Sequence, residues 1–435
     1  MTPITTTDLR SCLPQGALSL GGFALLLVWT LTRLWQDDLG DISGQLLVLL
    51  SAGWLLTGGR ALWRSRLLQL LLLALLIQLA SWGLSHLLHP DLAERSPKLD
   101  RLAAWFFLIP VALFCAASRQ RVMICWACAL GALLLSPWLS GDGWKELLQG
   151  LNGERVHFGL LNAQHSGMLF GIGLLGALML PAPVPATTRR GVVLGRLLRL
   201  LLITATAFGM LLSQTRGIWL ALLCSVPLAL LLRSRLRQQQ QADYISRPLR
   251  RLAWFSMTFV VIIITPLGGI IEDRLRSEGP LAGYDGEGFV LQENVRVRLS
   301  TWHTAMDWIV QRPLLGWGGK GRAAVVQDTE ALSDNERQRF RHLHSTYLDT
   351  LVNWGLAGLA VLLGLFAWLG LRLRRSWQQG SLDTNLLCFG VAFGLYWGVA
   401  NAFESFMFYQ SGLYALALIA GGLLALCNTP EEVSP

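Results

Sequence analysis

Charged residues are scarce in this chain. Only 14% of its 435 residues are Asp, Glu, Lys or Arg, whereas a typical soluble domain carries about 25%. Hydrophobic residues make up 53% of the chain, and they fall in blocks close to the roughly 20 residues that a helix needs to cross a bilayer. This composition argues against an ordinary soluble protein and predicts an all-α integral membrane protein.

Features of several other protein classes are also missing. The seven cysteines mostly lie inside apolar blocks, so they do not form the disulfide framework of a secreted domain. The net charge of +9 is spread over short clusters between apolar blocks, which argues against nucleic acid as a partner. No clear small-residue cleavage site follows the first apolar run, so we expect a retained helix there and no cleaved signal peptide.

Apolar runs separated by polar breaks predict about twelve transmembrane helices. The expected spans cover residues 17–35, 43–58, 67–88, 102–118, 122–140, 159–180, 197–214, 217–233, 252–271, 346–371, 384–400 and 408–427. The chain would then divide into a first membrane part, a large helical loop, a second membrane part and a short tail, at residues 1–271, 272–345, 346–427 and 428–435.

Arginine-rich connections alternate along the chain with connections that contain more acids. The most basic ones are 189–199, 233–251 and 372–375. Short basic loops stay on the cytoplasmic side of a membrane. The pattern predicts that both termini are cytoplasmic and that the 272–345 loop faces the outer side of the membrane, which is the periplasm if the cell is Gram-negative.

The 272–345 loop is the one long polar stretch, and its pattern predicts two helices. The first, at 294–311, carries apolar residues on one stripe and would lie on the membrane or on the helix bundle. That stripe consists of Val295, Leu299, Trp302, Met306 and Ile309. The second begins with the capping-box pattern of Ser333–Glu336. Arg337, Arg341 and His344 would share one face of it.

Several polar residues of the predicted outer face are candidates for a functional site. Arg216 lies between two apolar runs, where an arginine needs a partner or a polar cavity, although an arginine at a helix end can also snorkel to the interface. Arg296 and Arg298 point to different faces of their helix. Either guanidinium could bind phosphate oxygens bidentately or form part of a solvated face. Arg155, at the start of the sixth span, could line the same cavity or anchor the interface.

His344 is the candidate general base. A histidine titrates near neutral pH and can accept a proton from a hydroxyl. Nearby arginines would favour the neutral form that a base requires. The alternative is an ordinary surface histidine at a helix terminus.

A series of motifs follows in one order along the chain. They are S-Q-T-R-G at 213–217, R-L-S-T-W at 298–302, P-L-L-G-W-G at 313–318, H-L-H-S-T-Y-L at 342–348 and L-V-N-W-G-L-A-G at 351–358. In this order and on one predicted face, they resemble the O-antigen ligase and polymerase superfamily over roughly residues 200–420. Ser345 departs from the asparagine that often follows the histidine in that superfamily, which affects fine positioning.

The resemblance implies a GT-C-like membrane glycosyltransferase that inverts configuration and needs no metal or other cofactor. The absence of a D-x-D motif from the outer loop agrees with this. By resemblance, His344 is the catalytic base, and Arg216 and Arg298 hold a diphosphate. The remaining candidates for substrate binding are Arg155, Arg296, Trp302, Arg341 and His342.

Ligases of this superfamily transfer polysaccharide from undecaprenyl diphosphate to lipid A–core. We therefore expect the lipid-linked donor, the lipid A–core acceptor and membrane lipids as partners. An O-antigen polymerase and a protein O-oligosaccharyltransferase are the nearest alternatives. A lipid-linked glycan transporter or flippase is the alternative from another class. A transporter predicts ionisable groups in the middle of its spans, and the spans of this chain are nearly free of charge.

Overall fold

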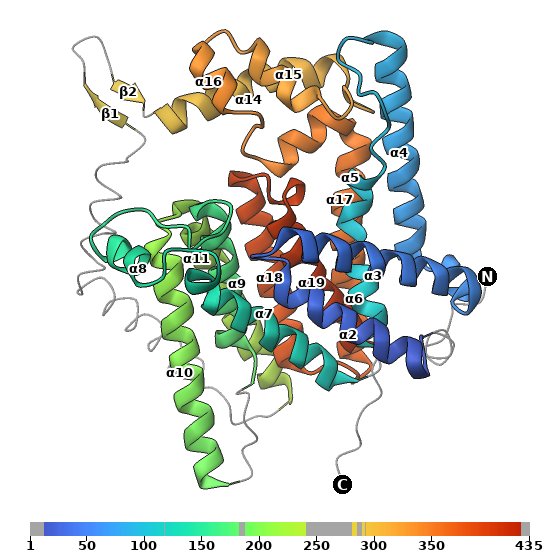
Figure 1. Ribbon diagram of the computed structural model, residues 1–435, viewed down its shortest axis with the longest axis vertical. Helices are drawn as coiled ribbons and strands as arrows, with labels where there is room; N and C mark the ends of the chain where they lie inside the picture. The colour runs from blue at the N-terminus through green and yellow to red at the C-terminus, as the bar shows by residue number, and fades with distance from the viewer. Residues whose placement is uncertain are drawn as a thin grey trace.

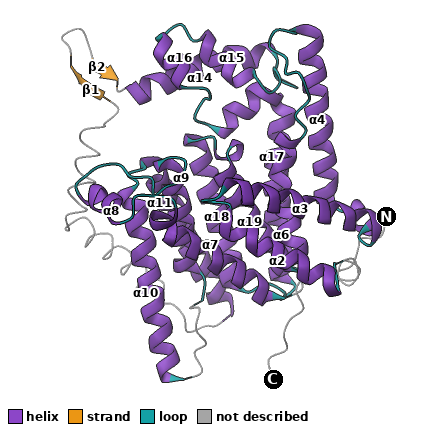
Figure 2. Cartoon of the chain, in the orientation of Figure 1, coloured by secondary structure: helices purple, strands orange, loops and turns teal. Residues whose placement is uncertain are grey.

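Helices make up most of the structure, a computed structural model that describes residues 13–116, 118–181, 188–240, 281–284, 289–291 and 293–427 (Figure 2). The expected span 252–271 lies outside the described residues. The long helices are α2 (Gly16–Thr32), α3 (Asp37–Thr57), α4 (Arg66–Leu88), α7 (Arg119–Leu139), α9 (Ala163–Met179), α10 (Arg189–Leu212), α11 (Arg216–Gln240), α17 (Thr346–Gln378), α18 (Thr384–Phe403) and α19 (Gln410–Leu426).

Seven helices within the described ranges are long and apolar enough to cross a membrane, namely α3, α4, α7, α10, α11, α17 and α18. The helices α2, α9 and α19 are apolar but shorter. The chain is therefore a multi-pass membrane protein. In Figure 1, α18 and α19 lie in the middle of the bundle, and α19 is buried along almost its whole length.

The fourth expected span is wrong as a single helix. Residues 102–118 fall on three short pieces, α5 (Asp100–Ala103), η2 (Ala104–Phe106) and α6 (Leu108–Cys115). Every residue of α6 is buried, so this piece packs inside the protein. Other short helices are η1 (Arg60–Arg64), α8 (Trp144–Leu151) and η3 (Phe406–Phe408).

The polar loop forms a compact outer domain at one end of the bundle (Figure 1). It contains α14 (Glu293–Gln311), α15 (Gly321–Asp328) and α16 (Asp334–Arg339). Its small core includes Val297, Trp317, Val325 and Leu343, and Val352 of α17 packs into the same cluster. Before α14, an antiparallel pair of short strands, β1 (Leu281–Tyr284) and β2 (Phe289–Leu291), departs from the expectation of an all-α protein.

Both helices predicted in this loop are present, but the details differ. Ser333 caps α16, and its capping box with Glu336 is complete. The buried line of α14, however, runs through Val297, Thr301 and Ala305, whereas the expected stripe residues Leu299 and Met306 are 49% and 53% exposed. The apolar periodicity therefore predicted the helix but not the face that it buries.

The outer domain is attached to α17 at a break in that helix. Gly355 has φ 63° and ψ −160° in the middle of α17, a backbone region essentially restricted to glycine. The break frees backbone groups on both sides of Gly355, and these bond to the Pro313–Gly318 segment. The four backbone hydrogen bonds are Leu356 N–H to Pro313 O at 2.7 Å, Ala357 N–H to Leu314 O at 3.1 Å, Trp317 N–H to Val352 O at 2.8 Å and Gly318 N–H to Asn353 O at 2.9 Å.

We call this paired segment the latch. A Cβ on Gly316 would lie 2.5 Å from the Val352 carbonyl oxygen, and one on Gly355 would lie 2.4 Å from the Leu314 backbone. The α4 helix also bonds to both sides of the latch, because Ser81 donates to Asn353 O and Ser85 donates to Trp317 O. The latch thus fixes the outer domain on the bundle.

Gly355→Ala tests the latch. The substitution forces a Cβ into backbone and a side chain into a glycine region, which costs about 1–3 kcal/mol for the conformation alone. We expect a clear fall in the thermal unfolding temperature in detergent. Gly370→Ala is the matched control, since Gly370 lies in the same helix and a methyl group added there would meet no atom within 4 Å. Equal unfolding temperatures for the two variants would contradict the role of the latch.

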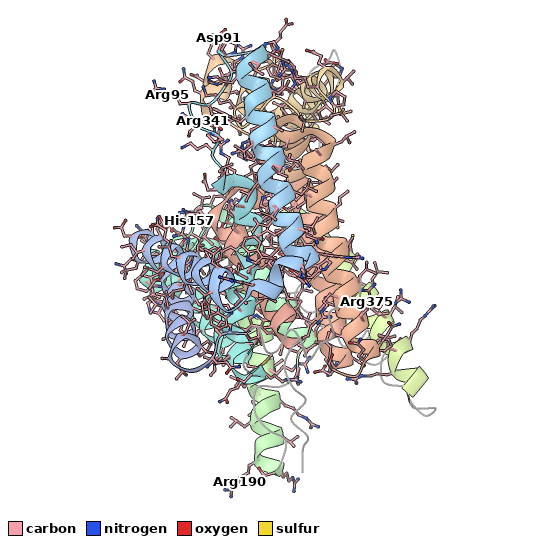
Figure 3. All side chains as sticks on the ribbon, turned by 90° about the vertical axis from the view of Figure 1, so that its right-hand side faces the viewer. Asp91, Arg95, His157, Arg190, Arg341 and Arg375 are labelled. Atoms are coloured by element: carbon pink, nitrogen blue, oxygen red, sulfur yellow. The ribbon has the colours of Figure 1, made fainter. Side chains whose placement is uncertain are left out.

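Two charged regions mark opposite ends of the molecule. Asp91, Arg95 and Arg341 lie at the end that carries the outer domain, and Arg190, at the start of α10, lies at the other end (Figure 3). This separation agrees with the alternation of basic connections along the sequence.

We predict that cysteines placed at Arg341 and Arg190 face opposite sides of the membrane. In a cysteine-free background, an impermeant thiol reagent should label Arg341→Cys in cells with only the outer membrane permeabilised. Arg190→Cys should react only after the inner membrane is opened. The reverse order of labelling would refute the predicted orientation.

Candidate functional site

A cavity of about 420 Å³ lies where the outer domain meets the membrane bundle. Segments far apart in the sequence supply its walls: the link before α9, the first turns of α11 and α14, the link after α16 and the end of α18. The charged and polar lining residues are Arg155, Gln164, Gln214, Thr215, Arg216, Arg298, His344 and Glu404. The structure thus brings Arg216, Arg298 and His344 together, with Arg155 beside them.

Arg216 is the first residue of α11 and follows a tightly held turn. Gln214 has a left-handed backbone with φ 51°, and its side-chain Nε2 donates to the carbonyls of Gly153 at 2.8 Å and Glu154 at 3.2 Å. Thr215 donates to the Ala163 carbonyl at 3.0 Å. The turn therefore depends on contacts with the 153–163 segment, and it aims the N-terminus of α11 at the cavity.

Three arginines, Arg155, Arg216 and Arg298, and one carboxylate line this cavity. Burial and the neighbouring Arg216 lower the pKa of Arg155. Burial also lowers the pKa of Arg298, and the charges of Arg155 and Arg216 lower it further. Three cations with one nearby carboxylate, Glu404, make an environment that favours an anion of more than one charge. Arg155 is partly committed to the turn, since it donates to Ser213 O at 3.2 Å and Thr215 Oγ1 at 3.4 Å.

His344 does not lie on a helix face with Arg337 and Arg341, as the sequence pattern suggested. The α16 helix ends at Arg339, and His344 has a left-handed backbone with φ 52°. Its neighbour Leu343 is held on both backbone groups: the N–H donates to Asp349 Oδ1 at 3.0 Å, and the carbonyl accepts from Trp302 Nε1 at 2.7 Å. These contacts support a conformation that costs about 1–3 kcal/mol.

Glu404, just after α18, is the residue that sequence reasoning missed. Its side chain is buried and bridges two histidines: Oε1 lies 2.8 Å from His342 Nε2, and Oε2 lies 3.1 Å from His344 Nδ1. The Ser405 N–H also donates to Oε1, at 2.9 Å. Tyr409 extends the network, with its hydroxyl 3.1 Å from His342 Nδ1. No local sequence motif marked Glu404, because its importance arises from contacts with residues 60 positions away.

The other candidates have different places. Arg296 points away from the cavity and pairs with Glu336 and the Ala331 carbonyl. Trp302 holds the Leu343 carbonyl. Arg341 is exposed, and neither it nor His342 lines the cavity. Arg296, Trp302, Arg341 and His342 therefore lie outside the lining of this cavity, and their roles in substrate binding stay predictions.

His342, His344 and Glu404 also form a group that could hold a metal ion, with ligand atoms within 4.8 Å of one another. In the structure these atoms are joined by hydrogen bonds within the group, and Tyr409 occupies the second nitrogen of His342. These hydrogen bonds engage both ring nitrogens of His342 and Nδ1 of His344.

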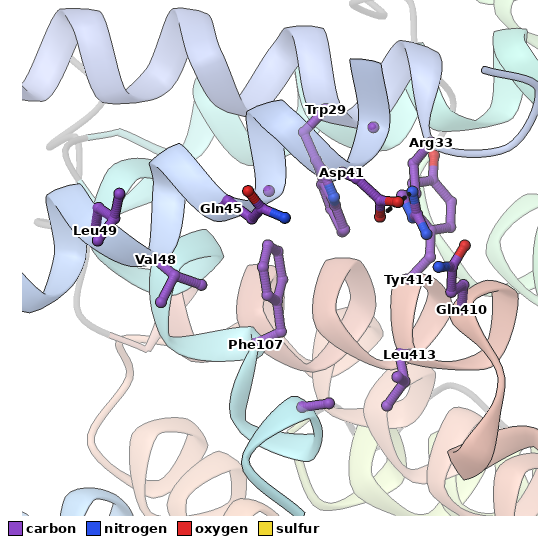
Figure 4. A pocket seen from close by; sticks show the side chains of 13 residues that line it. Trp29, Arg33, Asp41, Gln45, Val48, Leu49, Phe107, Gln410, Leu413 and Tyr414 are labelled. Atoms are coloured by element: carbon purple, nitrogen blue, oxygen red, sulfur yellow. Dashed lines mark ion pairs between the residues drawn. The ribbon is translucent and has the colours of Figure 1, made fainter. Parts of the chain in front are cut away.

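A second cavity, of about 510 Å³, lies between α2, α3 and the start of α19 (Figure 4). Apolar residues dominate its walls, among them Trp29, Phe107 and Leu413. Its charged groups are Arg33 and Asp41, which pair with each other at 2.9 Å. With no histidine and no surplus cation in its lining, this cavity suits apolar chains better than acid–base chemistry, so we assign the chemistry to the smaller one.

Comparison with known families agrees with the position of the smaller cavity. Residues 200–363 match the family model described as O-antigen ligase, a segment that includes Arg216, Arg298, His344 and both sides of the latch. No curated protein shows significant similarity to the chain. The matched family implies a membrane enzyme of the glycosyltransferase kind. Over residues 200–363 the chain is therefore similar to the O-antigen ligase family, which supports a member of the O-antigen ligase/polymerase superfamily.

Proposed function

We propose that the protein is an O-antigen ligase that transfers polysaccharide from undecaprenyl diphosphate to lipid A–core at the periplasmic face of the inner membrane. The observation that carries the proposal is the convergence of Arg216, Arg298 and His344 on one cavity. A donor diphosphate needs cations and an acceptor hydroxyl needs a base, and both kinds of group line the same space.

The cavity suits a diphosphate in two ways. The three arginines of the lining offer charged hydrogen bonds, which are the strong ones for phosphate oxygens. The first turn of α11 also faces the cavity with Arg216 and Gly217, and a helix N-terminus favours an anion through its free N–H groups and dipole. In the reaction, these groups stabilise the charge that develops on the leaving diphosphate.

His344 takes the role of the base. The acceptor hydroxyl gives its proton to the imidazole, and its oxygen forms a bond to the anomeric carbon of the donor sugar. The bond from that carbon to the diphosphate oxygen breaks, and undecaprenyl diphosphate leaves with the electron pair. Attack opposite the leaving group inverts the configuration. The arginines neutralise the diphosphate, so the mechanism requires no metal ion.

The position of the cavity fits two lipid-linked substrates. It opens between the outer domain and the ends of membrane helices, so a lipid tail can remain among the helices while its head group enters. The apolar cavity between α2, α3 and α19 is a further place for an acyl or prenyl chain.

Arg298→Lys and Arg296→Lys form a matched pair for donor binding, two residues apart on one helix. Lysine keeps the charge but loses the planar fork. We expect donor affinity in nanodiscs to fall about tenfold or more for Arg298→Lys, the scale of a lost charged hydrogen bond. Arg296→Lys should leave the affinity unchanged, because Arg296 pairs with Glu336 outside the cavity. Equal effects of the two changes would contradict the assignment.

His344→Ala tests the chemistry and the reaction together. Loss of a general base lowers transfer by roughly 100-fold or more, while donor binding should persist. In a deletion strain complemented with His344→Ala, a lipopolysaccharide gel should show intact core without the long ladder. The wild-type copy should restore the ladder. A core capped with a single repeat would instead indicate a polymerase, and a normal ladder with His344→Ala would remove the base assignment.

A further inference from the structure

The buried carboxylate of Glu404 contacts His342 and His344 at once. Its ionisation state determines which ring nitrogens of the two histidines carry protons. Burial would raise the pKa of Glu404, but the hydrogen bonds from His342 and His344 outweigh burial and hold that pKa well below its usual range. Glu404 is therefore ionised and can only accept hydrogen bonds. Both imidazole nitrogens that face it must carry protons.

The positions of these protons fix the tautomers of both rings. His344 faces Glu404 with Nδ1, so a neutral His344 carries its proton on Nδ1 and leaves Nε2 unprotonated. His342 faces Glu404 with Nε2, so a neutral His342 has the opposite tautomer, and its Nδ1 accepts from the Tyr409 hydroxyl. Each hydrogen bond from Tyr409 through His342 and Glu404 to His344 then has one donor and one acceptor.

We propose that Glu404 is a positioning residue that locks His344 in the Nδ1–H tautomer and thereby makes Nε2 the proton-accepting atom. The tautomer is a property of the resting protein. The role in transfer rests on the proposed function. Once His344 has taken the acceptor proton, the carboxylate also stabilises the imidazolium, as a carboxylate does in other histidine bases.

Glu404 also offsets an unfavourable environment. Burial lowers the pKa of His344, and His342 and Arg298 lower it further, whereas Glu404 raises it. The charged and titratable groups around His344, Glu404 and the cavity are His165, His342, Tyr409, Glu404, Arg155, Arg216 and Arg298. Without the carboxylate, burial and the charge of Arg298 would lower the pKa of His344 unopposed, and His344 would be a weaker base.

Glu404→Gln breaks the arrangement in a defined way. A carboxylate offers two acceptor oxygens, but a glutamine amide offers one oxygen and one NH₂ donor. It cannot accept from both imidazoles through separate atoms, so one histidine must change its tautomer. Glu404→Asp keeps both acceptors and the charge. Glu330→Gln is the control, because Glu330 is an exposed acid of the same outer domain.

The first measurement is nitrogen NMR of protein labelled at its seven histidines, with His344→Gln and His342→Gln used for assignment. In the wild type at mildly alkaline pH, we expect Nδ1–H at His344 and Nε2–H at His342. In Glu404→Gln, one of the two tautomers should change and the pKa of His344 should fall. Nε2–H at His344 in the wild type, or spectra unaltered by Glu404→Gln, would overturn the proposal. The NMR test does not require activity. If the wild type transfers no polysaccharide, that result contradicts the proposed function but not the assignment of the tautomers.

The second measurement is single-turnover transfer against pH. A base must be neutral, so the rate falls as pH drops below the pKa of His344. Glu404→Gln should lower the maximal rate at least about tenfold, the scale for a partner that orients a functional histidine. It should also move the acid limb to lower pH. Glu404→Asp should recover part of the rate, and Glu330→Gln should match the wild type.

Two results of the transfer measurements would contradict the positioning role of Glu404. A slower Glu404→Gln enzyme with the acid limb in its wild-type position would indicate a merely structural role for Glu404. Loss of wild-type activity in excess chelator, with recovery on adding zinc and shifts of the His342 and His344 signals, would identify the group as a metal site.

Discussion

The site depends on the backbone pairing between the Pro313–Gly318 segment and the break in α17 at Gly355. This latch joins the outer domain, which carries Arg298, to the helix that begins just after His344. Trp354, next to the break, stacks on Phe408 with an interplanar angle of 7°, and η3 lies between Glu404 and α19. The glycine conformation at the break therefore helps to connect the parts of the chain that hold Arg298, His344 and Glu404.

The electrostatic cost of this site comes from placing three arginines close together. Each arginine alone would be a costly cation in a partly desolvated place, and the mutual repulsion of Arg155, Arg216 and Arg298 adds to that cost. Among the described residues that line the cavity, Glu404 is the one carboxylate, and the two histidines already engage it. A site that is strained in this way gains most when a dianionic group enters it.

Local patterns in the sequence predicted the local features well. The capping box of α16, the helix at 294–311 and the opposite directions of Arg296 and Arg298 follow from spacing alone, and the structure confirms them. Features that need distant contacts were missed. The periodic placement of His344 beside Arg341 is wrong because the helix ends at Arg339, and Glu404 has no motif of its own. The break of 102–118 into α5, η2 and α6 likewise depends on packing inside the bundle.

Two left-handed residues show why such sites resist prediction. Gln214 stands two residues before Arg216, and His344 stands two residues before the start of α17. Both conformations are unfavourable for a side chain that is not glycine, so a short isolated segment would abandon them. They persist because other elements supply the bonds: the 153–163 segment at Gln214, and Asp349, Trp302 and Glu404 around His344. The geometry of the site is therefore a property of the assembled fold, and damage to any of these distant supports should reach the chemistry through the backbone.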